Sequence, residues 1–137
     1  MSTALLNIAA ALDTKLSTLA GSWPIAWENV EYRPTALVSH LRPTFLPASA
    51  RQADLGSAGR NFLTGVYQVD IFTPTGPGRA VAIAKADAVV THFKRGTSLT
   101  SGGYPVTCVR AVAAPGRVDG AWYIVSVSVY WRAYADN

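Results

Sequence analysis

Two segments of the chain alternate apolar and polar side chains with a period of two. In residues 62–73 the apolar positions are Tyr67, Val69 and Ile71, and polar residues lie between them. Residues 121–133 alternate more strongly, with one set formed by Tyr123, Val125, Val127, Val129 and Trp131. Because successive side chains of a strand point to opposite faces, both segments are predicted strands with one buried face. We expect the last strand to be central in its sheet.

Two other segments have the spacing of an amphipathic helix. In residues 3–20, Leu and Ile side chains recur every three or four positions, Ser2 or Thr3 can cap the start, and Gly21 follows the end. Residues 79–94 are rich in alanine and end before Gly96. This second helix is predicted to carry two stripes, one of large side chains and one of small side chains that permits close packing: Ile83, Val90 and Phe93, and Ala80, Ala84 and Ala88.

The remaining segments contain many turn residues. Residues 35–46 resemble a strand, but two prolines remove backbone donors, which predicts an edge strand or a bulge. Residues 48–61 are polar and contain glycines, so they are predicted to form a long functional loop. Residues 105–112 form a further predicted strand, and Asp119-Gly120 is a hairpin signal before the last strand.

The order helix, strand, strand, helix, strand, strand predicts one α+β domain over residues 1–137. We expect a mostly antiparallel sheet of four to five strands with both helices packed on one face. The chain shows no internal repeat and no linker, which agrees with a single domain.

Composition adds an expectation about partners. The 137 residues include 12 Lys and Arg against 8 Asp and Glu, a net charge of +4, and only 15% are charged. A surface with so few charges suggests that part of it is covered by a partner, so self-association is expected. The net positive charge makes a small basic nucleic-acid-binding α+β module the alternative interpretation, but the charge supports it only weakly because Lys and Arg are scattered rather than clustered.

The residues that could carry chemistry are isolated from one another. His40 and His92 lie in different elements, and the lone Cys108 lies in an apolar segment, where a buried hydrophobic role is expected. Asp70 occupies the polar side of a strand, where a solvated or salt-bridged carboxylate is usual. The turn at residues 75–78 lacks the third glycine of a phosphate-binding loop. We therefore expect no catalytic residue, cofactor or metal, and no membrane-spanning segment.

The sequence also contains a recognisable motif. Residues 65–72 read GVYQVDIF and are followed by Pro74, Gly76 and Gly78. This run resembles the central motif of the tail terminator family of long-tailed bacteriophages, the proteins similar to minor tail protein U. The opening helix, the Trp23-Pro24 turn, the Arg51-Gln52 segment, the end of the second helix and the last strand agree in order and spacing.

The resemblance implies a structural virion protein and no enzyme. It implies a ring of six copies that caps the tail tube at its head-proximal end, stops tube polymerisation and presents a surface for head-tail joining. The implied partners are other copies of the chain, the tail tube protein and the head-tail connector protein, with DNA only as the genome passing through the bore. Assembly is expected in the host cytoplasm.

On this interpretation, three groups of residues are interface hypotheses. The polar loop carries Arg51, Gln52, Asp54 and Arg60, which would contact a neighbouring subunit or the tube. Gln68 and Asp70 are expected to be exposed on the sheet, at the ring contact or lining the bore. The residues flanking the second helix, which would meet an acidic surface, are Arg79, Lys94 and Arg95.

Overall fold

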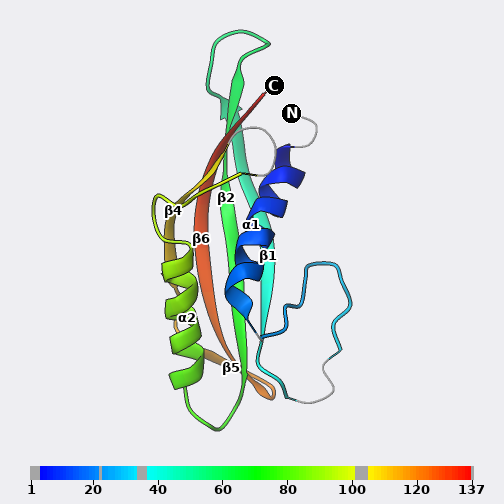
Figure 1. The fold of residues 1–137 in the computed structure, drawn as a ribbon, viewed down its shortest axis with the longest axis vertical. Coiled ribbons are helices and arrows are strands. Elements are labelled where there is room, and N and C mark those ends of the chain that lie inside the picture. Colours follow the sequence, from blue (N-terminus) through cyan, green and yellow to red (C-terminus); the bar gives the residue numbers. More distant parts are fainter. Residues whose placement is uncertain (1–3, 22, 34–36, 101–104, 137) are drawn as a thin grey trace.

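The computed structural model describes residues 4–21, 23–33, 37–100 and 105–136. Within them the chain forms one six-stranded sheet and two helices (Figure 1). The elements are α1 (Ala4–Ala20), β1 (His40–Gln52), β2 (Arg60–Pro74), α2 (Ala80–His92), β3 (Ser98–Leu99), β4 (Val106–Ala113), β5 (Arg117–Asp119) and β6 (Trp122–Asp136). The strand order is β1-β2-β6-β4-β3, with β5 also paired to β6. The predicted α+β class is confirmed.

The antiparallel pair of β2 and β6 forms the centre of the sheet. Tyr67 lies opposite Val129, and Ile71 lies opposite Val125, so the predicted alternation brings both apolar sets to one face. All four side chains are buried. Because β6 lies between β2 and β4, the expectation that the last strand is central is confirmed.

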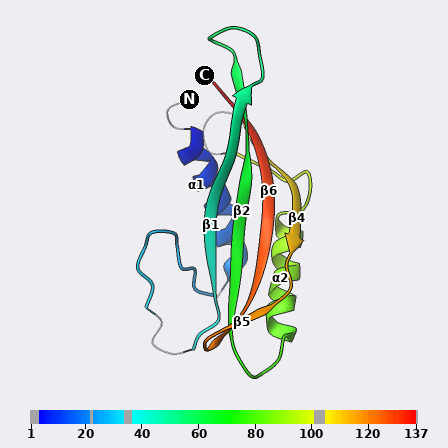
Figure 2. The same ribbon diagram turned by 180° about the vertical axis from the view of Figure 1, so that it is seen from behind.

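Both helices cover the same face of this sheet, in front of it in Figure 1 and behind it in Figure 2. We call this face the helix-covered face. The opposite face carries the even-numbered residues of β2 and β6, and we call it the open face. The core between helices and sheet includes Leu12 and Leu16 of α1 and Phe93 after α2. The two layers therefore leave one sheet face without a helix.

The helix boundaries agree closely with the predicted ones. Gly21 has φ of 60°, the left-handed conformation of a helix C-cap that glycine adopts readily. The proposed caps Ser2 and Thr3 lie outside the described residues. In α2, the predicted stripe of large side chains is only partly buried: Phe93 is buried, but Ile83 is 41% exposed. The predicted stripe of small side chains is not the packed one, since Ala80 and Ala84 are exposed. The buried residues are instead Ala82, Ala86, Val89 and the following Phe93, whose spacing of four, three and four follows the helical period.

Strand β1 is an edge strand, as the prolines predict. The register shifts between Pro47 and Ser49, where a β-bulge interrupts the pairing with β2. Beyond the bulge the strand continues to Gln52, so the expectation of a loop over residues 48–61 is wrong. The sequence of this part of β1 does not alternate between apolar and polar residues. Both faces of the strand are largely exposed here, so neither face needs apolar side chains.

Candidate functional site

The β1–β2 hairpin projects beyond the rest of the sheet at one end of the molecule (Figures 1 and 2). Arg51 pairs with Phe62 and Gln52 pairs with Asn61, so these two interface candidates lie on a strand. The connecting loop spans only residues 53–59. A short loop on a regular ladder presents its side chains in a more defined position than a long flexible loop would.

Asp54 and Arg60 hold this loop together. Nε of Arg60 donates to Oδ2 of Asp54 at 2.7 Å, and Nη2 of Arg60 donates to Oδ1 at 3.2 Å. The backbone amide of Arg60 also donates to Oδ2 at 3.2 Å. The side-chain hydrogen bonds from Arg60 lower the pKa of Asp54, so the carboxylate is charged near neutral pH. The two residues therefore form a bidentate ion pair that closes the hairpin loop.

The tip of the hairpin exposes a large apolar side chain. Leu55 is 95% exposed and directly follows Asp54, which pairs with Arg60 across the loop. A Cβ at Gly59 would lie 2.8 Å from the Cβ of Asp54, so glycine allows the loop to close tightly. Leu55 was not among the residues predicted from the sequence. Its one signal was a lone leucine within a polar run of residues.

Gln68 and Asp70 lie together on the open face, but Asp70 is only 3% exposed, so the expectation of an exposed carboxylate is wrong. Its oxygens accept hydrogen bonds from Ser126 at 2.5 Å and from Gln68 at 2.9 Å. Arg42 forms an ion pair with it at 3.4 Å, which agrees with the salt-bridged alternative. The side chains that donate to the Asp70 carboxylate also cover it. Asp70 therefore cannot contact a partner directly, but it can position these neighbouring side chains.

The three basic candidates at α2 do not form one cluster. Arg79 is the N-cap residue of α2, whereas Lys94 and Arg95 follow its C-terminus. The 13-residue helix separates them by roughly 20 Å at 1.5 Å per residue. The β2–α2 connection also lies at the end of the molecule opposite the 53–59 loop (Figure 1). The structure therefore divides the predicted interface residues among separate surfaces.

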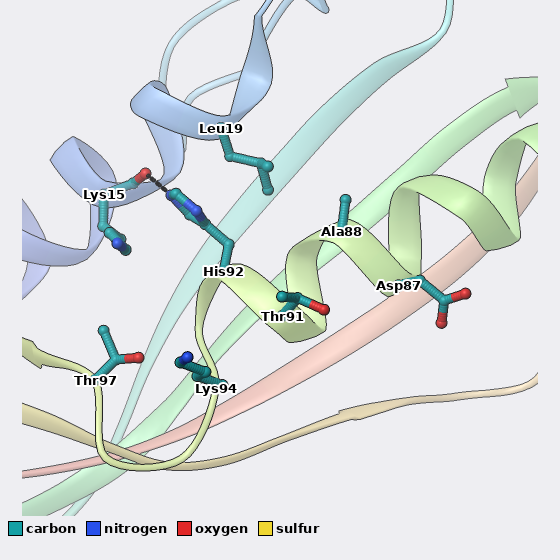
Figure 3. A pocket seen from close by; sticks show the side chains of 8 residues that line it. All are labelled: Lys15, Leu19, Asp87, Ala88, Thr91, His92, Lys94 and Thr97. Atoms are coloured by element: carbon teal, nitrogen blue, oxygen red, sulfur yellow. Dashed lines mark hydrogen bonds between the residues drawn. The ribbon is translucent and has the colours of Figure 1, made fainter.

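A cavity of about 530 Å³ lies between the two helices (Figure 3). Nε2 of His92 donates to the carbonyl oxygen of Lys15 at 2.8 Å and lies 3.0 Å from Oγ1 of Thr18. The other side chains around the cavity include Asp87, Lys94 and Thr97. His92 therefore joins α1 to α2, and its Nε2 is occupied by this contact.

A second cavity, of about 550 Å³, lies where the segment before β1 meets the open face. His40 stacks on Phe72 with ring centroids 4.6 Å apart and contacts Trp122 edge to face at 4.9 Å. Nδ1 of His40 lies 2.9 Å from the carbonyl oxygen of Val38 and donates to it. The packing of these rings fixes the lower part of the open face.

Cys108 is buried, as expected, and burial raises the pKa of its thiol to about 11. The thiol therefore remains protonated and unreactive at neutral pH. Among the described residues, no group of three or more His, Cys, Asp or Glu side chains could hold a metal ion. In the same residues, no helix is long and apolar enough to span a membrane.

Comparison with known proteins adds two findings. The family described as phage tail terminator protein matches residues 7–131. One solved structure is similar over 97% of this chain and 96% of its own, with 26% sequence identity and a TM-score of 0.77. No curated protein matches the chain.

Proposed function

Because the chain belongs to the phage tail terminator family, we propose that it forms a ring of six copies that caps the head-proximal end of the tail tube. The family is structural rather than enzymatic, and the chain is accordingly a structural component of a phage tail. In our proposal, residues 1–137 form a single terminator domain whose ring stops tube polymerisation. The same ring then offers a surface to the head-tail connector.

The projecting β1–β2 hairpin is the observation that carries the proposed ring contact. Leu55 stands 95% exposed at its tip, and the Asp54–Arg60 ion pair keeps the loop ordered. An ordered loop with an exposed leucine binds at a lower entropy cost than a flexible polar loop. A hairpin that reaches from one copy onto a different surface of the next gives a head-to-tail contact, which closes into a ring when the rotation suits.

The remaining predicted interface residues lie on separate surfaces, which supports the proposal that each subunit contacts several neighbours. Arg79 lies at the start of α2, while Lys94 and Arg95 lie past its end. A subunit of a capping ring has a copy on each side, the tube below and the connector above. We assign the basic residues at α2 to contacts with the tube protein or the connector. Gln68 would belong to the ring contact or the bore, and the buried Asp70 would position it by accepting its hydrogen bond.

The ring is tested by measuring the assembly state of the full chain alone and with tail tubes, by light scattering and negative-stain microscopy. We expect rings for the unchanged chain, and we expect Leu55→Asp to abolish them while the fold persists. Val118→Asp is the matched control, because Val118 is 68% exposed on β5, which lies at the end of the molecule opposite the 53–59 loop (Figure 1). Rings of Leu55→Asp indistinguishable from those of the unchanged chain would contradict the assigned contact.

Termination is tested separately by polymerising the tail tube protein in the presence of the chain. We expect tubes to stop growing once the chain is added and to remain at their length. Phage that lack this gene should form tails of irregular length without heads. Tails of normal length in its absence would remove the proposed function.

A further inference from the structure

The open face of the sheet gathers arginine and no lysine among the described residues. Five arginines have exposed side chains on this face or its margin: Arg42, Arg51, Arg110, Arg117 and Arg132. The three lysines lie on or next to the helices instead, at Lys15, Lys85 and Lys94. Arg79 and Arg95 also lie next to α2, but the absence of lysine from the open face distinguishes it from the rest of the described surface.

Three of these guanidinium groups lie over aromatic rings of the same face. Arg110 lies 4.0 Å from the ring centroid of Tyr130, Arg42 lies 4.7 Å from that of Phe72, and Arg51 lies 5.1 Å from that of Phe62. Such cation–π contacts fix the plane of the guanidinium and leave its N–H edges available. The edges are therefore oriented before a partner arrives.

Except for Arg42, these arginines have no acidic partner in the part of the chain that the structure describes. Arg51, Arg110 and Arg132 form no ion pair with a described carboxylate. Arg117 donates to the hydroxyl of Ser126 at 3.1 Å, and Arg42 is only partly satisfied by Asp70 at 3.4 Å. The guanidinium groups of this face can therefore donate hydrogen bonds to an acidic group outside the chain.

The dimensions of the face indicate a large acceptor. Arg42 lies opposite Asp70 and Arg51 lies opposite Phe62, eight residues apart along β2. At about 3.3 Å per residue the cations span roughly 26 Å. A small anion would bridge only one or two of them, so an extended acidic surface matches the spacing better.

A second copy of the chain is poorly suited as the acidic partner. Asp13 accepts from Tyr67, Glu28 from the amide of Phe45, Glu31 pairs with Arg33, and Asp54 pairs with Arg60. With Asp70, five of the eight carboxylates in the sequence are thus already engaged within the chain. Two open faces would also repel each other, because both are positive.

We propose that the open face binds an acidic surface of a different protein. Arginine and aromatic residues are enriched and lysine is depleted at protein interfaces, and the face has this composition. Nucleic acid is the less favoured polyanion because guanidinium groups already cover the rings of Phe62 and Tyr130 on which bases would stack. This inference does not depend on ring formation by the hairpin.

The test uses the full chain with fluorescent poly-L-glutamate as an acidic polypeptide and duplex DNA of equal charge as the nucleic-acid probe. The variant Arg51→Lys with Arg110→Lys keeps both charges but loses the planar donors. We expect it to bind poly-L-glutamate about tenfold more weakly, since lysine cannot form bidentate bonds to a carboxylate. Arg33→Lys is the control, because Arg33 lies outside the sheet and already pairs with Glu31, and it should bind unchanged.

Three results would overturn the proposal. Unchanged binding by Arg51→Lys with Arg110→Lys would show that charge alone attracts the polypeptide. Tighter binding of DNA than of poly-L-glutamate, with a steep salt dependence, would assign the face to nucleic acid. Loss of self-association in Arg110→Lys alone, which leaves the hairpin unchanged, would show by sedimentation that a second copy covers the face. Intact rings with weakened poly-L-glutamate binding would support this inference and leave the proposed ring unaffected.

Discussion

The hydroxyl of Tyr67 donates a hydrogen bond to Oδ1 of Asp13 at 2.6 Å and so joins strand β2 to helix α1. Tyr67 is buried and Asp13 is partly buried. Burial raises the pKa of Asp13, and the hydrogen bond from Tyr67 opposes this effect in part. Burial and the neighbouring Asp13 also raise the pKa of Tyr67, so its hydroxyl remains a donor. The contact positions α1 but places a carboxylate in a partly desolvated site.

Asp13→Asn should stabilise the protein in a pH-dependent manner. An acid whose pKa is raised by folding is protonated in the folded state before the unfolded state, so its charged form opposes folding at higher pH. The variant's free energy of unfolding minus that of the unchanged chain should therefore increase as the pH rises from 3.8 through the raised pKa of Asp13. Above that pKa the difference should be constant. Urea unfolding at a series of pH values measures it.

Tyr67→Phe separates the hydrogen bond from the charge. The phenylalanine keeps the ring contact with Phe93 but removes the donor to Asp13. We expect a loss of about 1–3 kcal/mol in the free energy of unfolding at neutral pH, because a partly buried acceptor loses its partner. In the Asp13→Asn background the loss should be smaller. Equal losses in both backgrounds would contradict an interaction between the two side chains.

Gly65→Ala should destabilise the sheet because Trp131 fills the space beside Gly65. A Cβ there would lie 2.5 Å from Cζ2 of Trp131 and 2.7 Å from the carbonyl oxygen of Leu46. Overpacking of this kind costs about 1–3 kcal/mol. Trp131→Phe removes the indole atoms in contact, so the cost of Gly65→Ala in that background should fall without vanishing. Thermal unfolding of the four proteins in the cycle measures the coupling.

The strongest sequence patterns predicted the centre of this fold. Tyr67 and Val129 belong to long alternating runs, and burial of one face makes such alternation necessary. The end of β1 beyond Pro47 could not be predicted in this way, because neither of its faces is covered. The short strands β3 and β5 were missed since two or three residues are too few to show a period.

The candidate site was less predictable because it depends on distances between segments. The sequence indicated that Arg60 and Asp54 lie in one polar region, but their bidentate pairing follows from the register of the hairpin. Nor does the sequence show that Ser126 covers Asp70, since 56 residues separate them. The row of arginines on the open face likewise forms only when four strands align.

Asp70→Ala should destabilise the protein, because it removes the buried carboxylate that joins three side chains of the open face. Asp70 accepts hydrogen bonds from Ser126 and Gln68 and pairs with Arg42, and the hydroxyl of Ser126 is buried. Removing the common acceptor should cost about 1–3 kcal/mol in the free energy of unfolding. Asp119→Ala, at an exposed carboxylate on β5, should change stability by less than about 0.5 kcal/mol. Similar small effects of both substitutions in chemical denaturation would show that the Asp70 network contributes little.

Asp54→Asn should loosen the hairpin loop while leaving the rest of the sheet intact. The amide cannot form the charged bidentate pair with Arg60, although the backbone amide of Ala53 still faces the carbonyl oxygen of Arg60 at 2.9 Å. We expect faster hydrogen exchange at Ala53 and unchanged exchange at Val69 in the sheet centre. In the unchanged chain, protection of Ala53 relative to its intrinsic exchange rate should be lost as the pH falls through the lowered pKa of Asp54, since an acid with a lowered pKa stabilises the fold only while charged. Because the ordered loop presents Leu55, ring assembly should weaken in parallel, and a variant with a loosened loop but normal rings would separate loop order from assembly.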